Sequence, residues 1–126
     1  MKFFATKTNK LTDYTIIKKE KLEECKNLIS ISLESFFLSI ELEKYFSENN
    51  LRSLCGRYLV KKSILDHFKT NNFLEIQILN NEKGKPDINI LGELKQKAKL
   101  LGISNLQCSI SHSKNWVASM VVIEIN

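Results

Sequence analysis

The C-terminal half of the chain contains two hairpin patterns separated by one short helical stretch, and this order limits the folds that it can adopt. In each hairpin, apolar and polar side chains alternate on both sides of a short polar connection, which predicts two paired strands. The predicted strands and the helix between them cover residues 73–79, 87–90, 93–101, 105–111 and 116–125. An antiparallel sheet is therefore expected in this half.

A long amphipathic helix is predicted upstream of the hairpins, over residues 51–68, with Asn49 or Asn50 as its cap. Its apolar side chains recur at close to helical spacing. They are Leu51, Leu54, Cys55, Tyr58, Leu65 and Phe68. A shorter helix is expected over residues 40–46, capped by Ser39. Together with the hairpins, these helices predict an α+β fold in which an antiparallel sheet packs against a long helix.

The N-terminal part of the chain carries weaker signals. Residues 17–28 are rich in Lys and Glu and predict a helix, whereas 28–33 alternate apolar and small polar side chains and predict a strand. Residues 2–6 fit either a strand or a flexible arm. The length suits one domain. We therefore expect a domain over residues 28–126, preceded by an N-terminal extension over residues 1–27.

Charge and cysteine content restrict the classes of partner. The net charge of +5 suits an anionic partner, but it is equally consistent with an ordinary basic surface. No long basic run or aromatic-rich basic sheet predicts nucleic-acid binding. The three cysteines form no Cys-x-x-Cys pair, which argues against a zinc site and favours reduced thiols in the cytoplasm. No apolar run is long enough to span a membrane.

Four short fragments occur in order along the chain. They are Phe37–Phe46, Leu54–Lys61 with its Gly-Arg pair, Gly84-Lys85-Pro86, and Ser109–Ser113 with its Ser-His-Ser corner. From residue 28 onward, their order and spacing resemble the holo-acyl-carrier-protein synthases of the 4′-phosphopantetheinyl transferase superfamily. The resemblance implies that family's fold and its reaction, the transfer of the 4′-phosphopantetheine arm from coenzyme A to a serine of an acyl carrier protein. It also implies an acidic carrier protein as partner, and a homotrimer with sites between subunits.

The resemblance implies the site residues as well. Those expected at the coenzyme are Arg57, Lys61, Lys85, Ser111, His112 and Ser113. Those expected to take part in catalysis are Lys62, Asp66 and His112. In the family pattern, a metal-binding glutamate stands at the position of Lys62 and a phosphate-contacting lysine stands at the position of Asp66. The two charges are therefore exchanged in this chain.

The exchange leaves the metal site open to two interpretations. Lys62 and Asp66 are four residues apart on one helical face, so they can form an ion pair. An ammonium group cannot ligate magnesium, and at short range it repels a divalent cation by several kcal/mol, on the order of the Coulomb energy in a partly buried site. Either Glu34 and Asp66 supply the carboxylates for magnesium while Lys62 contacts the diphosphate, or metal binding is weak or absent.

The same departures support an alternative function. Ser30 and Ser32 stand where the family has two glycines before its metal-binding aspartate. Combined with the exchange at Lys62 and Asp66, this pattern is consistent with a catalytically inactive pseudoenzyme that binds coenzyme A, a carrier protein or both. Measured transfer activity distinguishes the enzyme from the pseudoenzyme.

Overall fold

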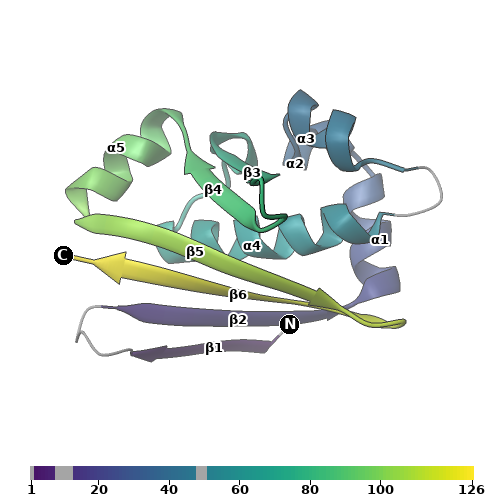
Figure 1. Ribbon diagram of the computed structural model, residues 1–126, viewed down its shortest axis with the longest axis horizontal. Helices are drawn as coiled ribbons and strands as arrows, with labels where there is room; N and C mark the ends of the chain where they lie inside the picture. Colours follow the sequence, from purple (N-terminus) through teal and green to yellow (C-terminus); the bar gives the residue numbers. More distant parts are fainter. Residues whose placement is uncertain (1, 8–12, 48–50) are drawn as a thin grey trace.

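The computed structural model describes residues 2–7, 13–47 and 51–126, with side chains for the last two ranges (Figure 1). Within these residues, β1 (Lys2–Lys7), β2 (Tyr14–Lys21), β5 (Ile103–His112) and β6 (Trp116–Ile125) form an antiparallel sheet in the order β1-β2-β6-β5. A separate hairpin pairs β3 (Ile76–Asn80) with β4 (Pro86–Ile90). The helices are α1 (Leu22–Ser30), α2 (Leu33–Phe36), α3 (Ser39–Tyr45), α4 (Arg52–Phe68) and α5 (Gly92–Leu100), and the 3-10 turn η1 spans Phe73–Glu75.

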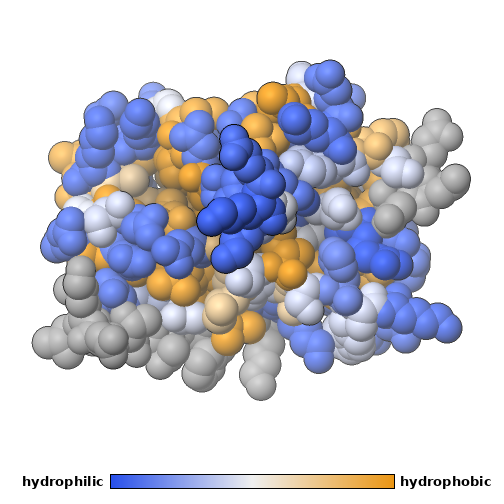
Figure 2. Space-filling view, viewed as in Figure 1, coloured by the Kyte–Doolittle hydropathy of each residue, from blue (hydrophilic) through white to orange (hydrophobic). Residues whose placement is uncertain are grey.

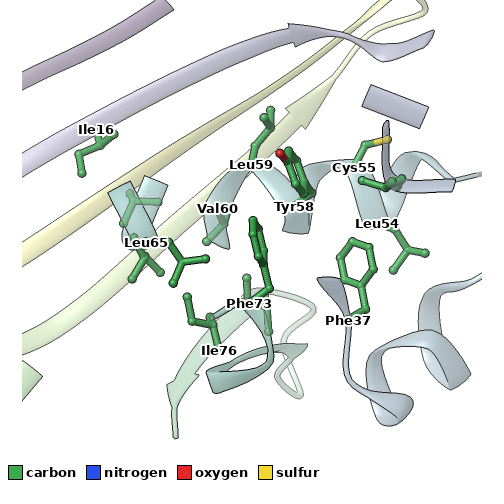
Figure 3. Packing of buried hydrophobic residues seen from close by; sticks show 14 of the residues in the cluster. Ile16, Phe37, Leu54, Cys55, Tyr58, Leu59, Val60, Leu65, Phe73 and Ile76 are labelled. Carbon is green, nitrogen blue, oxygen red and sulfur yellow. The ribbon is translucent and has the colours of Figure 1, made fainter. Parts of the chain in front are cut away.

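The long helix α4 is the centre of the fold and packs on β2, β5 and β6 on one side and on α1 and η1 on others. Because several elements cover it, most of its side chains from Leu54 onward are buried rather than only one stripe. Figure 3 shows Leu59 and Leu65 of this helix in the same cluster as Ile16 of β2. The Tyr58 ring stacks on Phe73 of η1, with 5.5 Å between centroids. The predicted α+β class, with an antiparallel sheet against a long helix, is confirmed.

Gly56 allows α4 to lie directly against β5. A Cβ atom built at this position would collide with the Cγ2 atom of Ile110 on the strand. Any residue other than glycine would therefore force the side chain of Ile110 or the whole helix to move. Because the interior is packed as densely as an organic crystal, little free space exists to absorb that shift.

The C-terminal secondary-structure predictions are confirmed. In the N-terminal part, the predicted strand is wrong, and the predicted helix is right only over its second half. The predicted helix 17–28 is instead the end of β2 followed by α1, since pairing with β1 and β6 on both sides outweighs the helical composition. The predicted strand 28–33 is the end of α1 and the start of α2; its Ile31 is 83% exposed and has no sheet to pack on. Residue 28 thus lies within α1, and part of the predicted extension forms an inner strand. The predicted caps at 49 and 50 fall outside the described residues.

A fully buried ion pair joins α3 to α4. Lys61 Nζ lies 2.6 Å from Glu41 Oε1, and neither side chain is exposed. Their other partners are backbone groups: the carbonyls of Phe36 and Phe73 accept from Lys61, and the amides of Leu38 and Ile78 donate to Glu41. Burial lowers the pKa of Lys61, against the opposing attraction of Glu41. The pair ties α2, α3, η1 and β3 to the long helix.

We expect stability to fall in acid partly because of His67, which packs against the ring of Tyr14. Burial lowers the pKa of His67 below its ordinary value of 6.5. The unfolded chain therefore binds a proton first, so the contribution of neutral His67 is present above that value and is lost as the pH falls through the folded pKa. Urea unfolding at about pH 7.5 and about pH 5 should show a smaller acid loss for His67→Gln than for the wild type. An equal loss would contradict this assignment.

None of the helices in the described part of the chain combines the length and the apolar character needed to cross a bilayer.

Candidate functional site

Arg57 is buried and holds the β3–β4 hairpin against α4. Its Nε donates to the carbonyl of Ile78 at 3.2 Å, and its Nη2 donates to Asn80 Oδ1 at 2.9 Å. A third hydrogen bond goes to the carbonyl of Ser53, and the guanidinium lies 3.5 Å from the ring centroid of Tyr45. The described contacts of Arg57, like those of Lys61, are therefore directed at the chain itself. The role of both residues at the coenzyme stays a prediction.

The other predicted residues of α4 form a charged cluster with β2. Lys62 Nζ lies 3.1 Å from Asp66 Oδ1, as the helical spacing predicts. Lys18 Nζ of β2 lies 2.7 Å from Asp66 Oδ2, and its side chain is 4% exposed. Partial burial raises the pKa of Asp66, but the hydrogen bonds from Lys18 and Lys62 outweigh it and lower the pKa overall. The carboxylate is therefore ionised at neutral pH, and the cluster carries two positive charges and one negative charge.

The residues of this cluster do not fit a magnesium ion. Each oxygen of Asp66 already accepts a lysine ammonium group, and a divalent cation would have to displace at least one of them. Glu34 is exposed on α2, and no described contact joins it to Asp66. In the residues with described side chains, no three His, Cys, Asp or Glu lie close enough to hold a metal. The role of Glu34 and Asp66 as metal ligands therefore stays a prediction.

The Ser-His-Ser corner lies at the end of β5 and lines a hollow of about 210 Å³. The lining residues are Lys19, Ser111, His112, Ser113, Trp116 and Ala118. Lys19 Nζ lies 4.4 Å from the ring centroid of Trp116, which is a cation–π contact. Loss of hydration lowers the pKa of His112, and the charges of Arg52 and Arg57 lower it further. The imidazole is therefore neutral at pH 7 and can accept a proton.

A larger hollow of about 590 Å³ lies between the turn that joins β3 to β4 and strand β5. Lys85 and Pro86 of the predicted Gly-Lys-Pro turn line one side, and residues 105–110 line the other. Figure 2 shows a strongly hydrophilic patch over this hairpin, where Lys83 and Lys85 are exposed. The hollow is large enough for part of a nucleotide-sized ligand.

The His112 corner and the Lys62–Asp66 cluster are placed at different levels along α4. The influence of Arg52 and Arg57 on His112 places the corner near the N-terminal half of α4. Asp66 is nine residues beyond Arg57, which corresponds to about 14 Å along the helix. Figure 1 shows the same arrangement, with the β5–β6 turn at the end of the molecule where α4 begins.

Lys18 is the site residue that sequence reasoning missed. The composition of residues 17–28 predicts a helix, and a helix there gives no indication that Lys18 contacts Asp66. The available signal was the alternation over Ile16, Lys18 and Glu20, which places all three side chains on one face of a strand. A lysine on the inner face of a strand requires a buried partner.

Known proteins similar to this chain were found by sequence and by structure, although no protein-family model matches it. The holo-[acyl-carrier-protein] synthase of Dehalococcoides mccartyi strain CBDB1 is 30% identical over 95 residues, which cover 73% of this chain and 78% of that protein. The synthase of Thermoanaerobacter sp. strain X514 is 28% identical over 113 residues, or 85% of this chain and 81% of its own.

Solved structures agree with these relatives. The Helicobacter pylori holo-[acyl-carrier-protein] synthase in complex with coenzyme A matches with a TM-score of 0.72 and 21% identity, over 87% of this chain and 99% of that one. The Neisseria meningitidis enzyme matches with a TM-score of 0.75 and 20% identity, over 87% and 96% of the two chains. At about 20% identity, the solved structures show only that this chain shares their fold. The relationship to the family is shown by the sequence relatives, one of which is 30% identical. The chain therefore belongs to the holo-acyl-carrier-protein synthase family.

Proposed function

We propose that this protein transfers the 4′-phosphopantetheine arm of coenzyme A to a serine of an acyl carrier protein. The serine Oγ attacks the phosphorus atom next to the pantetheine, and a new phosphate ester bond forms. The bond from that phosphorus to the bridging oxygen breaks, and adenosine 3′,5′-bisphosphate leaves. The serine proton passes to a base. The observation that carries the proposal is the kinship with relatives that bear this name, over most of both chains.

His112 is the proposed base, because its lowered pKa keeps the imidazole neutral at the pH where transfer would occur. The adjacent Ser111 and Ser113, and Lys85 in the larger hollow, are proposed contacts of the coenzyme. The net charge of +5 and the exposed Lys83 and Lys85 favour an acidic carrier protein as the second substrate.

The site is proposed to be shared between copies of the chain in a homotrimer. Asp66 lies about 14 Å along α4 beyond Arg57, whose charge acts on His112, and this supports a site to which one copy supplies the His112 corner and a neighbouring copy the Lys62–Asp66 cluster. The sheet face turned away from α4 supports such a contact. Its side chains include Ile17, Trp116 and Met120, which are 39%, 39% and 40% exposed. A group of exposed apolar side chains on one face is typical of a protein interface.

Intact-mass measurement tests the reaction directly. Purified protein, coenzyme A and an apo-acyl carrier protein should give a carrier protein heavier by one phosphopantetheine arm. A carrier in which the acceptor serine is replaced by alanine provides the control and should gain no mass. Coenzyme A binding without any mass gain would favour the pseudoenzyme, and absence of both would contradict the proposal.

A further inference from the structure

We infer that Lys18, Lys62 and Ser119 bind the diphosphate of coenzyme A directly, so that lysine ammonium groups replace the divalent metal in this chain. The inference rests on the proposed function and identifies which groups at that site neutralise the diphosphate. The charged cluster around Asp66 contains two ammonium groups and one carboxylate, and it lies beside a buried hydroxyl group that lacks a hydrogen-bond partner.

Ser119 provides the observation that points to a ligand. It is the register partner of Lys18 across β2 and β6, so the two side chains leave the same face of the sheet, about 5 Å apart at their Cβ atoms. Ser119 is 3% exposed, and its Oγ has no hydrogen-bond partner among the described residues. Buried hydroxyl groups are nearly always hydrogen-bonded in folded proteins. A phosphate oxygen next to Lys18 would accept this hydroxyl.

The outer residues of the cluster are partly exposed, so a ligand can reach it from solvent. Lys18 is buried and fixed, whereas the side chains of Lys62 and Asp66 are 31% and 37% exposed. In the absence of a ligand, Asp66 balances the buried charge of Lys18. Lys62 is the outer member on a flexible stem, so it can turn from the carboxylate to an arriving phosphate oxygen without leaving a buried charge unpaired.

The charges of the cluster also explain how lysine side chains can neutralise the charge that a metal ion would otherwise neutralise. In phosphoryl transfer, a divalent cation mainly neutralises the negative charge that develops on the leaving oxygen. Two ammonium groups around one carboxylate leave one positive charge in excess, which can serve the same purpose. The same two ammonium groups repel a magnesium ion, whose preferred ligands are oxygen atoms.

Calorimetric titration with coenzyme A tests the inference. With EDTA present, coenzyme A should bind, and magnesium should change the dissociation constant by less than about twofold, within the scatter expected for screening. Tightening by about tenfold or more with magnesium would overturn the inference and leave the proposed function intact, because the coenzyme would still bind. Absence of binding in both conditions would overturn the inference and the proposed function together.

Variants of the cluster separate ligand binding from a merely structural role. In EDTA, Lys62→Gln should raise the dissociation constant of coenzyme A by about tenfold, the usual effect of losing a hydrogen bond to a charged group. Lys95→Gln removes the same charge from an exposed position on α5 and should leave the constant unchanged. Circular dichroism melting verifies that both variants fold. If the two variants bind equally well, Lys62 does not contact the ligand and the inference fails.

Discussion

Replacing Glu41 with alanine should lower the free energy of unfolding by about 3–5 kcal/mol, the usual cost of removing one partner from a buried ion pair. The change leaves the ammonium group of Lys61 in the core without its counter-charge. It also leaves the amides of Leu38 and Ile78 without the carboxylate that accepts them. Guanidinium unfolding measures the loss as a lower midpoint at an unchanged slope.

Two further variants isolate the cause of that loss. The double variant Glu41→Leu with Lys61→Met should recover much of the lost stability, since both charges then disappear together. Glu23→Ala breaks the exposed Glu23–Lys26 pair, in which Glu23 is 80% exposed, and should change stability by less than about 1 kcal/mol. If Glu41→Ala is no more damaging than Glu23→Ala, the ion pair does not stabilise the fold.

His112→Ala should reduce the turnover number for transfer by at least about hundredfold, the effect typical of removing a general base. Partial burial, helped by the charges of Arg52 and Arg57, lowers the pKa of His112 below 6.5, so the wild-type rate should stay high to below pH 6.5 and fall as the pH passes through the lowered pKa. Measuring holo-carrier formation across pH gives both results. A higher KM with an unchanged turnover number would show that His112 only binds substrate.

Mixed oligomers test whether the site is shared. In co-expressed His112→Ala and Lys62→Gln chains, about a quarter of the sites in a ring-shaped oligomer should contain both intact residues. Transfer activity should therefore exceed that of either variant alone, and sedimentation should give the mass of a trimer. Activity no higher than the average of the two variants would mean that each chain carries a complete site of its own.

The sequence predicted the C-terminal half of the fold well because its signals are local. Alternation within a strand and the polar turn at Gly84 require no knowledge of distant residues. The N-terminal half was harder, since the Lys- and Glu-rich composition of β2 is typical of a helix, and only its pairing with β6 makes it a strand. The resemblance located the corner at His112 and the exchange at Lys62 and Asp66.

The direction of charged side chains could not be predicted. Lys61 and Lys62 are neighbours in the sequence, yet one is fully buried on Glu41 and the other is partly exposed beside Asp66. Which of the two side chains faces the core depends on how α4 is rotated against the sheet and η1. The local sequence pattern does not indicate this rotation. The contact of Lys18 with Asp66 joins residues 48 positions apart, so it depends on the tertiary fold.

The side chain of Gly56 is a single hydrogen atom, and this small size lets α4 lie directly against β5, the strand that carries His112. Ile110, which touches Gly56, is only two residues before His112 on β5. A methyl group at this position would push Ile110 away from α4. We expect the resulting shift of β5 to move the imidazole of His112 as well. The position of the imidazole thus depends on how closely a helix residue that contacts Ile110 lets α4 approach β5.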